Sequence, residues 1–304
     1  MPLKGVQFKS PLLWLQRLSN KCNTTQCRYA SGNTTYTSTP DTHTRSNRIA
    51  SLEHTDSTQQ EILHHAGLSA TWWDLNGPLH GLHKLNDLRV PFVRDGLMTH
   101  SDIQKHLINT NNVLQGKNIL EVGCGGGILT EALARLNANV TGVDLGEDVI
   151  NTAQKHLDKF SPELIERITY KIEPIEAHAR RNSNHYDAVV CSEVLEHIDD
   201  KAAFLRDCVK ALKPGGSIFI TTLNKTVPQW FGGIILGEYV FGVAPINTHH
   251  WHKLISPENV QLLLTALNCQ TVLLKGFTYD VFNNRFRWIK PTAMCYALHA
   301  IKNE

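Results

Sequence analysis

The 304-residue sequence predicts an α/β fold with a doubly wound, mostly parallel, seven-stranded sheet and a helical N-terminal lid. Two observations support this prediction. From residue 118 onward, short apolar runs alternate with helical patterns at the spacing of βαβ units. The runs show little polar alternation, which is typical of parallel strands that are covered on both faces. A ligand site is therefore expected at the carboxyl ends of the strands.

The first 48 residues differ in composition from the rest of the chain. They hold seven Lys or Arg, one Asp and 13 Ser or Thr, with a short apolar cluster around Trp14. A basic, Ser/Thr-rich and acid-poor leader is typical of organelle targeting, and we predict a mitochondrial transit peptide over residues 1–48. An unstructured basic tail is the alternative interpretation.

The body of the chain is weakly acidic and carries no cysteine framework. Its 256 residues hold 23 basic and 27 acidic side chains, which argues against nucleic acid as the main partner. None of the seven cysteines forms a C-x-x-C pair, and Cys124, Cys191 and Cys269 lie in or beside predicted strands. This pattern predicts buried free thiols in a reducing compartment, consistent with a mitochondrial matrix location.

The predicted elements follow in order. Residues 49–115 are helical and loop material that would form the lid, and residues 116–304 form the main domain. Strands are predicted at 118–124, 139–145, 168–173, 186–191, 217–222, 269–277 and 294–301. Helices are predicted at 128–135, 147–160, 199–212 and 256–267. The last helix has Ser256 to cap it and Pro257 in its first turn.

The loop after the first strand is the clearest binding signal. Gly123, Gly125 and Gly127 alternate there, and glycine lets backbone N–H groups approach a ligand. A tight strand-to-helix turn is the alternative reading of the same glycines. The dinucleotide spacing G-x-G-x-x-G fails because Ile128 occupies its third position, which argues against a nicotinamide-dependent oxidoreductase. Asp144 ends the second strand, where a carboxylate can accept both ribose hydroxyls. The pattern therefore favours a nucleoside without a diphosphate.

These residues carry a family resemblance. Glu121, the three alternating glycines and Asp144 resemble the S-adenosylmethionine site of the Rossmann-like class I methyltransferases. Four further segments, within about residues 52–302, resemble the ubiquinone-biosynthesis O-methyltransferases of mitochondria and Gram-negative bacteria: 71–75, 85–89, 192–198 and 248–253. This narrower resemblance implies O-methylation of polyprenylated catechols, namely 3,4-dihydroxy-5-polyprenylbenzoate and demethylubiquinol. It also implies a multi-enzyme complex as partner.

The resemblance assigns roles to individual residues. It implies that S-adenosylmethionine is contacted by Arg89, Gly123, Gly125, Asp144 and Ser192. Arg89 would pair with the methionine carboxylate, which suits its planar fork. Without the resemblance, a surface ion pair would be the simpler role for this arginine.

Glu193, Glu196 and His197 are the candidate metal ligands. On a helical turn, spacings of three and four would bring them to one face, although such clusters are commonly solvated helix surface. The family resemblance implies Mg²⁺ here, but imidazole better suits a softer ion. His197 is therefore either a ligand or the general base that takes the phenol proton, and His249 and His250 are the next candidate bases.

The insertion at 226–247 is the most apolar segment of the chain. Its Trp, Tyr, Phe and Gly residues suit a peripheral position in the membrane interface, here the matrix side of the inner membrane, where a polyprenyl substrate resides. A helix packed on the sheet and a surface covered by a partner protein are the alternatives. Two alternative functions also stay open: methylation of another small molecule, and a non-catalytic S-adenosylmethionine-binding scaffold.

Overall fold

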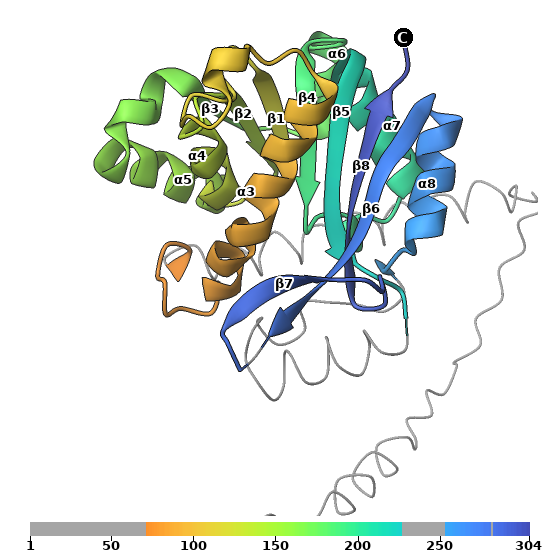
Figure 1. The fold of residues 1–304 in the computed structure, drawn as a ribbon. Helices are drawn as coiled ribbons and strands as arrows, with labels where there is room; N and C mark the ends of the chain where they lie inside the picture. The colour runs from red at the N-terminus through yellow and green to blue at the C-terminus, as the bar shows by residue number, and fades with distance from the viewer. Residues whose placement is uncertain (1–70, 227–252, 281) are drawn as a thin grey trace, which may run out of the picture. The chain divides into compact units, whose positions relative to one another are not determined.

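A computed structural model describes residues 71–226, 253–280 and 282–304. Within these residues, eight strands form one sheet in the order β3-β2-β1-β4-β5-β8-β6-β7 (Figure 1). The predicted transit peptide over 1–48 lies outside the described residues, as do the insertion after Thr226 and the two histidines at 249 and 250. No helix of the described part has the length and apolar character that crossing a bilayer requires.

Five parallel strands build the half of the sheet that carries the site. They are β1 (Asn118–Val122), β2 (Asn139–Asp144), β3 (Ile168–Ile172), β4 (Tyr186–Ser192) and β5 (Leu212–Leu223). Val122 pairs with Val143 of β2 and with Cys191 of β4, so these strands end at the same edge. Beyond β5, the antiparallel strands are β8 (Cys295–Lys302), β6 (Cys269–Asp280) and β7 (Arg285–Ile289).

Helices cover both faces of the sheet. One apolar core joins the strands to α3 (His80–His100), α4 (Ile128–Ala134) and α5 (Glu147–Phe160). The core on the other face joins them to α6 (Ile175–Arg181), α7 (Lys201–Ala211) and α8 (Pro257–Ala266). Short 3-10 turns lie at η2 (Lys105–Leu107), η3 (Pro162–Arg167) and η4 (Leu195–His197). The α/β class and the doubly wound, mostly parallel sheet are thereby confirmed.

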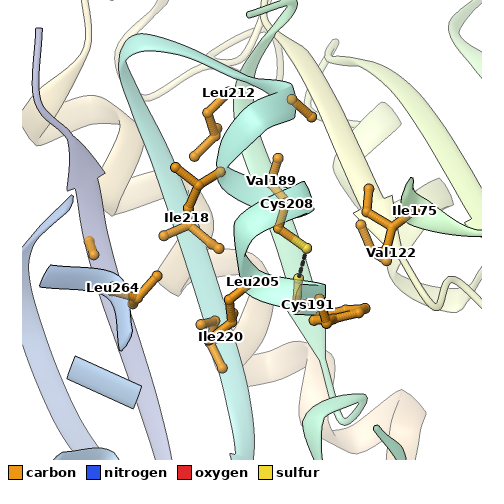
Figure 2. Close-up of a cluster of buried hydrophobic side chains, with 14 of the residues drawn as sticks. Val122, Ile175, Val189, Cys191, Leu205, Cys208, Leu212, Ile218, Ile220 and Leu264 are labelled. Atoms are coloured by element: carbon orange, nitrogen blue, oxygen red, sulfur yellow. Dashed lines mark hydrogen bonds between the residues drawn. The ribbon is translucent and has the colours of Figure 1, made fainter. Parts of the chain in front are cut away.

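The second core contains a pair of close thiols. Cys191 on β4 and Cys208 on α7 are fully buried, with their Sγ atoms 3.7 Å apart (Figure 2). Cys124, Cys191, Cys208 and Cys269 are all free and buried, and Cys295 is free and partly buried. The predicted buried free thiols are confirmed for the described part of the chain.

The number of strands was predicted wrongly. The sequence indicates seven strands, but Arg285–Ile289 forms an eighth one, β7, antiparallel to β6. In this strand, exposed Arg285 and Arg287 alternate with partly buried Phe286 and Trp288. The alternating segment is short, and two of its five residues are charged. Phe92 of α3 lies edge-on to Trp288, at 6.1 Å between ring centroids. The strand β7 is therefore marked by its contacts with β6 and α3 and not by an apolar run in its own sequence.

One helix and several element boundaries also differ from the prediction. The helix α6 was not predicted, because it has seven residues and four of them are charged or histidine. The predicted helix over 199–212 ends at Ala211, and β5 begins at Leu212, before the Pro-Gly-Gly turn rather than after it. Helix α5 has the predicted bounds, and Ser256 caps α8 through a bond from the Asn259 N–H, at 3.4 Å.

Helix α3 belongs to the core as well as to the predicted lid. Its residues Leu85, Phe92, Val93 and Leu97 are buried in the same cluster as Phe219 of β5. The Phe92 and Phe219 rings meet edge to face, at 5.3 Å between centroids. Helix α3, which lies within the predicted lid (49–115), is thus packed on the sheet, and the lid itself stays a prediction.

Candidate active site

The glycine loop (123–127) joins β1 to α4 at the carboxyl edge of the sheet. Gly123 has φ +74° and its N–H donates to the carbonyl of Val143, at 2.8 Å. A Cβ at Gly123 would lie 2.5 Å from Cγ2 of Val194, so a side chain there would require strain as well as a displacement of Val194. Gly123 is therefore required by its positive φ and by its close packing against Val194.

Asp144 lies next to the glycine loop and orders it. Its Oδ2 accepts from the N–H of Gly125 and its Oδ1 accepts from the N–H of Gly146, both at 2.9 Å. Burial raises the pKa of Asp144, while bonds from backbone N–H groups and the nearby His197 oppose that rise. Each carboxylate oxygen has a second lone pair, so the side chain can still accept from a ribose.

Arg89 is buried and meets Ser192, which lies 103 positions away in the sequence. Its Nη1 donates to the Ser192 hydroxyl at 3.0 Å, and its Nη2 donates to Asn86 and to the carbonyl of Leu82. Its Nε also donates to Asn86. Burial lowers the pKa of Arg89, and the charges of Glu121 and Glu193 raise it. The surface ion pair weighed as an alternative is excluded, because Arg89 is only 5% exposed.

Glu121 is a buried partner of Arg89 to which the sequence assigned no role of its own. Its Oε2 accepts from the Thr130 hydroxyl at 2.5 Å. Burial raises the pKa of Glu121 to about 7, against the opposing effects of Thr130 and Arg89. In the sequence, only the position of Glu121 two residues before Gly123 indicated that it belongs to the site.

Glu193 and Glu196 form a buried carboxylate pair after β4. They do not share one helical turn as predicted: Glu193 has φ +57°, whereas Glu196 lies on the 3-10 turn Leu195–His197. Oε2 of Glu196 accepts from the Thr222 hydroxyl at 2.6 Å. Oε1 of Glu193 and Oε1 of Glu196 are buried and accept no hydrogen bond. Burial, and then the charge of Glu196, raise the pKa of Glu193 to about 8.

Buried carboxylate oxygens without a partner are of the chemical kind that binds divalent cations. A buried carboxylate oxygen without a partner carries a desolvation cost that a hard cation would remove. Among the described residues, no group of three or more His, Cys, Asp or Glu is placed to hold a metal ion, and His197 as a third ligand stays a prediction. His197 ends the 3-10 turn, near enough to Glu193 and Asp144 for their charges to interact.

Most of the predicted site residues come together at one edge. Arg89, the glycine loop, Asp144, Ser192, Glu193, Glu196 and His197 all follow or contact the carboxyl ends of β1, β2 and β4. Trp72 and Trp73 also lie here, and the sequence assigned them no role beyond the resemblance. The indole of Trp73 donates to the carbonyl of Gly126 at 2.9 Å.

Comparison with known proteins agrees with this geometry. A family model described as a methyltransferase domain matches residues 120–218. Magnesium protoporphyrin IX methyltransferase from Synechocystis PCC 6803, solved with bound SAH, has a similar fold. Its TM-score is 0.50 at 18% identity, covering 74% of this chain and 85% of that one.

Three relatives share much more of the sequence. The mitochondrial ubiquinone biosynthesis O-methyltransferase of Mus musculus is 40% identical over 256 residues, covering 84% of this chain and 68% of the relative. The human protein of the same name is 41% identical over 258 residues, with the same coverage. The ubiquinone biosynthesis O-methyltransferase of Proteus mirabilis is 33% identical over 250 residues, covering 81% of this chain and 93% of the relative. The chain therefore belongs to the ubiquinone biosynthesis O-methyltransferase family and is an S-adenosylmethionine-dependent methyltransferase.

Proposed function

We propose that this enzyme transfers a methyl group from S-adenosylmethionine to a catechol oxygen of a polyprenylated substrate of ubiquinone biosynthesis. The substrates would be 3,4-dihydroxy-5-polyprenylbenzoate and demethylubiquinol. The observation that carries the proposal is the buried Glu193 and Glu196 pair, whose Oε1 atoms accept no hydrogen bond beside the cofactor loop. Such a carboxylate pair could hold a cation that binds both oxygens of a catechol. Methyl transfer to an amine would not need a cation.

The cofactor would occupy the carboxyl edge of β1, β2 and β4. Asp144 would accept from the ribose, and the backbone at Gly123 and Gly125 would face the adenosyl group. Ser192 and Arg89 would contact the methionine end. Four of the five N–H groups of Arg89 already bond to Asn86, Leu82 and Ser192, so the remaining one, on Nη1, would reach the methionine carboxylate.

Glu193 and Glu196 would hold a divalent cation, for which Mg²⁺ is the first candidate because both ligands are hard oxygens. When bound, the cation would favour the phenolate form of the catechol and orient its two oxygens. Without ionisation the phenol is a poor nucleophile, since an unperturbed phenol has a pKa of about 10. His197 would take the proton, with His249 and His250 as further candidates. The cofactor and catechol sites would then align sulfur, methyl carbon and oxygen.

The location of the enzyme follows from its leader and its relatives. The mammalian relatives are named as mitochondrial, and residues 1–48 have the composition of a transit peptide. A polyprenylated substrate resides in the bilayer, so we place the enzyme at the matrix side of the inner membrane. The apolar insertion at 226–247 would make the contact, and a multi-enzyme complex of the pathway would be the partner.

Metal removal and replacement tests the proposal. The purified full chain would be treated with EDTA and assayed with S-adenosylmethionine and a short-chain prenylated catechol acid. Mg²⁺, Mn²⁺ or Zn²⁺ would then be added back separately. We expect activity to be lost with EDTA and restored by one ion. Activity that is indifferent to EDTA would contradict the role of the carboxylate pair.

Two controls separate the alternatives. A monophenol with the same prenyl chain should not be methylated, because it offers only one oxygen to a cation. Methylation of an amine or a simple carboxylic acid at the rate of the catechol would favour a different substrate class. Binding of S-adenosylmethionine with no turnover under any ion would favour the scaffold.

A further inference from the structure

Two adjacent tryptophans pack directly on the glycine loop. Trp72 is 5% exposed, and a Cβ at Gly125 or Gly126 would overlap its indole ring. The Trp73 indole N–H donates to the carbonyl of Gly126, at 2.9 Å. The loop that receives the cofactor is therefore covered by one indole and hydrogen-bonded by the next.

Trp73 is held in turn by a histidine on α5. Its ring stacks on the imidazole of His156 with 3.4 Å between centroids and 3° between planes. His83 of α3 meets the same indole edge-on, at 5.5 Å. His83 also anchors the neighbouring backbone, because its Nε2 lies 2.9 Å from the carbonyl of Trp72, which can only accept.

A fully buried carboxylate fixes the orientation of His156. Nδ1 of His156 lies 2.7 Å from Oε1 of Glu131, whose side chain has no exposed surface. The other oxygen of Glu131 accepts from Arg135 at 2.9 Å and from the Ser161 hydroxyl at 2.7 Å. Because a carboxylate oxygen accepts, Nδ1 carries the proton and the ring plane is set. Glu131 therefore determines the surface on which Trp73 stacks.

We propose that His156 and Glu131 are positioning residues for S-adenosylmethionine. They act through Trp73, which holds the Gly126 carbonyl and with it the backbone of the glycine loop. Neither residue is expected to touch the cofactor. Glu131 on α4 contacts His156 on α5, His156 stacks on Trp73, and Trp73 bonds to Gly126. Because the glycine loop leads directly into α4, this set of contacts is closed. Such a closed set of contacts orders the loop before the cofactor arrives, and preorganisation favours binding.

Binding of S-adenosylhomocysteine to the full chain, measured by isothermal titration calorimetry, tests this proposal. We expect His156→Ala to weaken binding about five- to tenfold, since it removes both the stacked ring and the contact with Glu131. His156→Phe keeps a stacked ring but loses the contact with Glu131, and should recover only part of the loss. Trp73→Phe keeps the ring but loses the bond to Gly126, and should weaken binding roughly two- to fourfold.

A matched control lies on β8, outside the strands that carry the site. His299 is also buried, stacks on Phe219 at 4.2 Å and contacts the Ser217 hydroxyl at 2.9 Å. His299→Ala should lower the melting temperature but leave the affinity for S-adenosylhomocysteine within about twofold of the parent. In turnover, His156→Ala should raise KM for S-adenosylmethionine and leave kcat at saturation nearly unchanged.

Three results would overturn the proposal. They are parent-like binding by a folded His156→Ala protein, an equal loss in His299→Ala, and a His156→Phe protein as weak as His156→Ala. No methyl acceptor is present in the binding assay, so its outcome is independent of the catechol assignment.

Discussion

The cofactor side and the carboxylate side of the site differ in how completely their buried polar groups are bonded. On the cofactor side, Arg89 makes four hydrogen bonds and each oxygen of Asp144 accepts one from a backbone N–H. On the carboxylate side, Glu193 and Glu196 each bury an oxygen that accepts none. Glu193 also has a positive φ, which costs a non-glycine residue free energy.

This difference indicates that the two sides of the site are ordered to different degrees before a ligand binds. The cofactor side is ordered by bonds within the protein, so its ligand meets a preformed surface. The carboxylate side retains a strained backbone at Glu193 and two carboxylate oxygens whose hydrogen-bonding capacity is open to a bound group. Substitutions on the two sides should therefore affect different steps of the reaction.

The largest effect is expected at the carboxylate pair. Glu193→Gln combined with Glu196→Gln removes both acidic groups, and we expect kcat to fall at least about 100-fold, as when a group that stabilises developing charge is lost. The affinity for S-adenosylhomocysteine should change less than about threefold, because the cofactor side is untouched. Steady-state kinetics and calorimetry measure the two quantities.

Glu166→Gln is the matched control for this double variant, because Glu166 is an exposed carboxylate remote from these residues in the sequence. It should behave as the parent. A double variant that lost cofactor affinity and turnover in parallel would show that the two sides are not separable.

A smaller effect is expected from Glu121, and it concerns stability against pH. Its pKa is about 7 in the folded protein and 4.5 in a free side chain, so the unfolded chain loses its proton first as pH rises. The contribution of Glu121 is therefore fully present below pH 4.5 and is lost as pH rises through 7. Between pH 5 and 7, the parent should lose about 2 kcal/mol more unfolding free energy than Glu121→Gln.

Urea unfolding of both proteins at the two pH values measures this difference. Glutamine keeps an oxygen for the Thr130 hydroxyl, so the comparison isolates the charge. Parallel stability profiles would mean that Glu121 titrates as an ordinary carboxyl group and that Arg89 balances its burial completely.

The smallest effect is expected from Arg89→Lys. Lysine keeps the charge but cannot bond Asn86, Leu82 and Ser192 in one plane, so we expect the affinity for S-adenosylhomocysteine to fall about tenfold. The expected change in kcat is smaller than the change in KM for S-adenosylmethionine. A variant with unchanged affinity would show that the cofactor side does not depend on the planar fork.

The sequence predicted the fold class and the cofactor edge because both depend on local signals. Apolar runs, helix caps and the spacing of Gly123, Gly125 and Asp144 are written within short windows of the chain. The strand β7 was missed because its alternation of arginine with aromatic residues is weak by itself, and its partners are β6 and α3. The metal ligands were predicted from helical spacing together with the family resemblance and stay a prediction, and Glu193 adopts a left-handed conformation that no spacing reveals.

By itself, then, the sequence determined the order of most strands and helices, the glycine loop and the class of ligand it receives. The tertiary structure decided which side chains share the site. It buried Arg89 against Ser192, paired Glu193 with Glu196, and stacked Trp73 on a histidine oriented by Glu131. These contacts join residues that are far apart in the chain or reverse a local preference. Their free energy depends on burial and on neighbours that only the folded chain supplies.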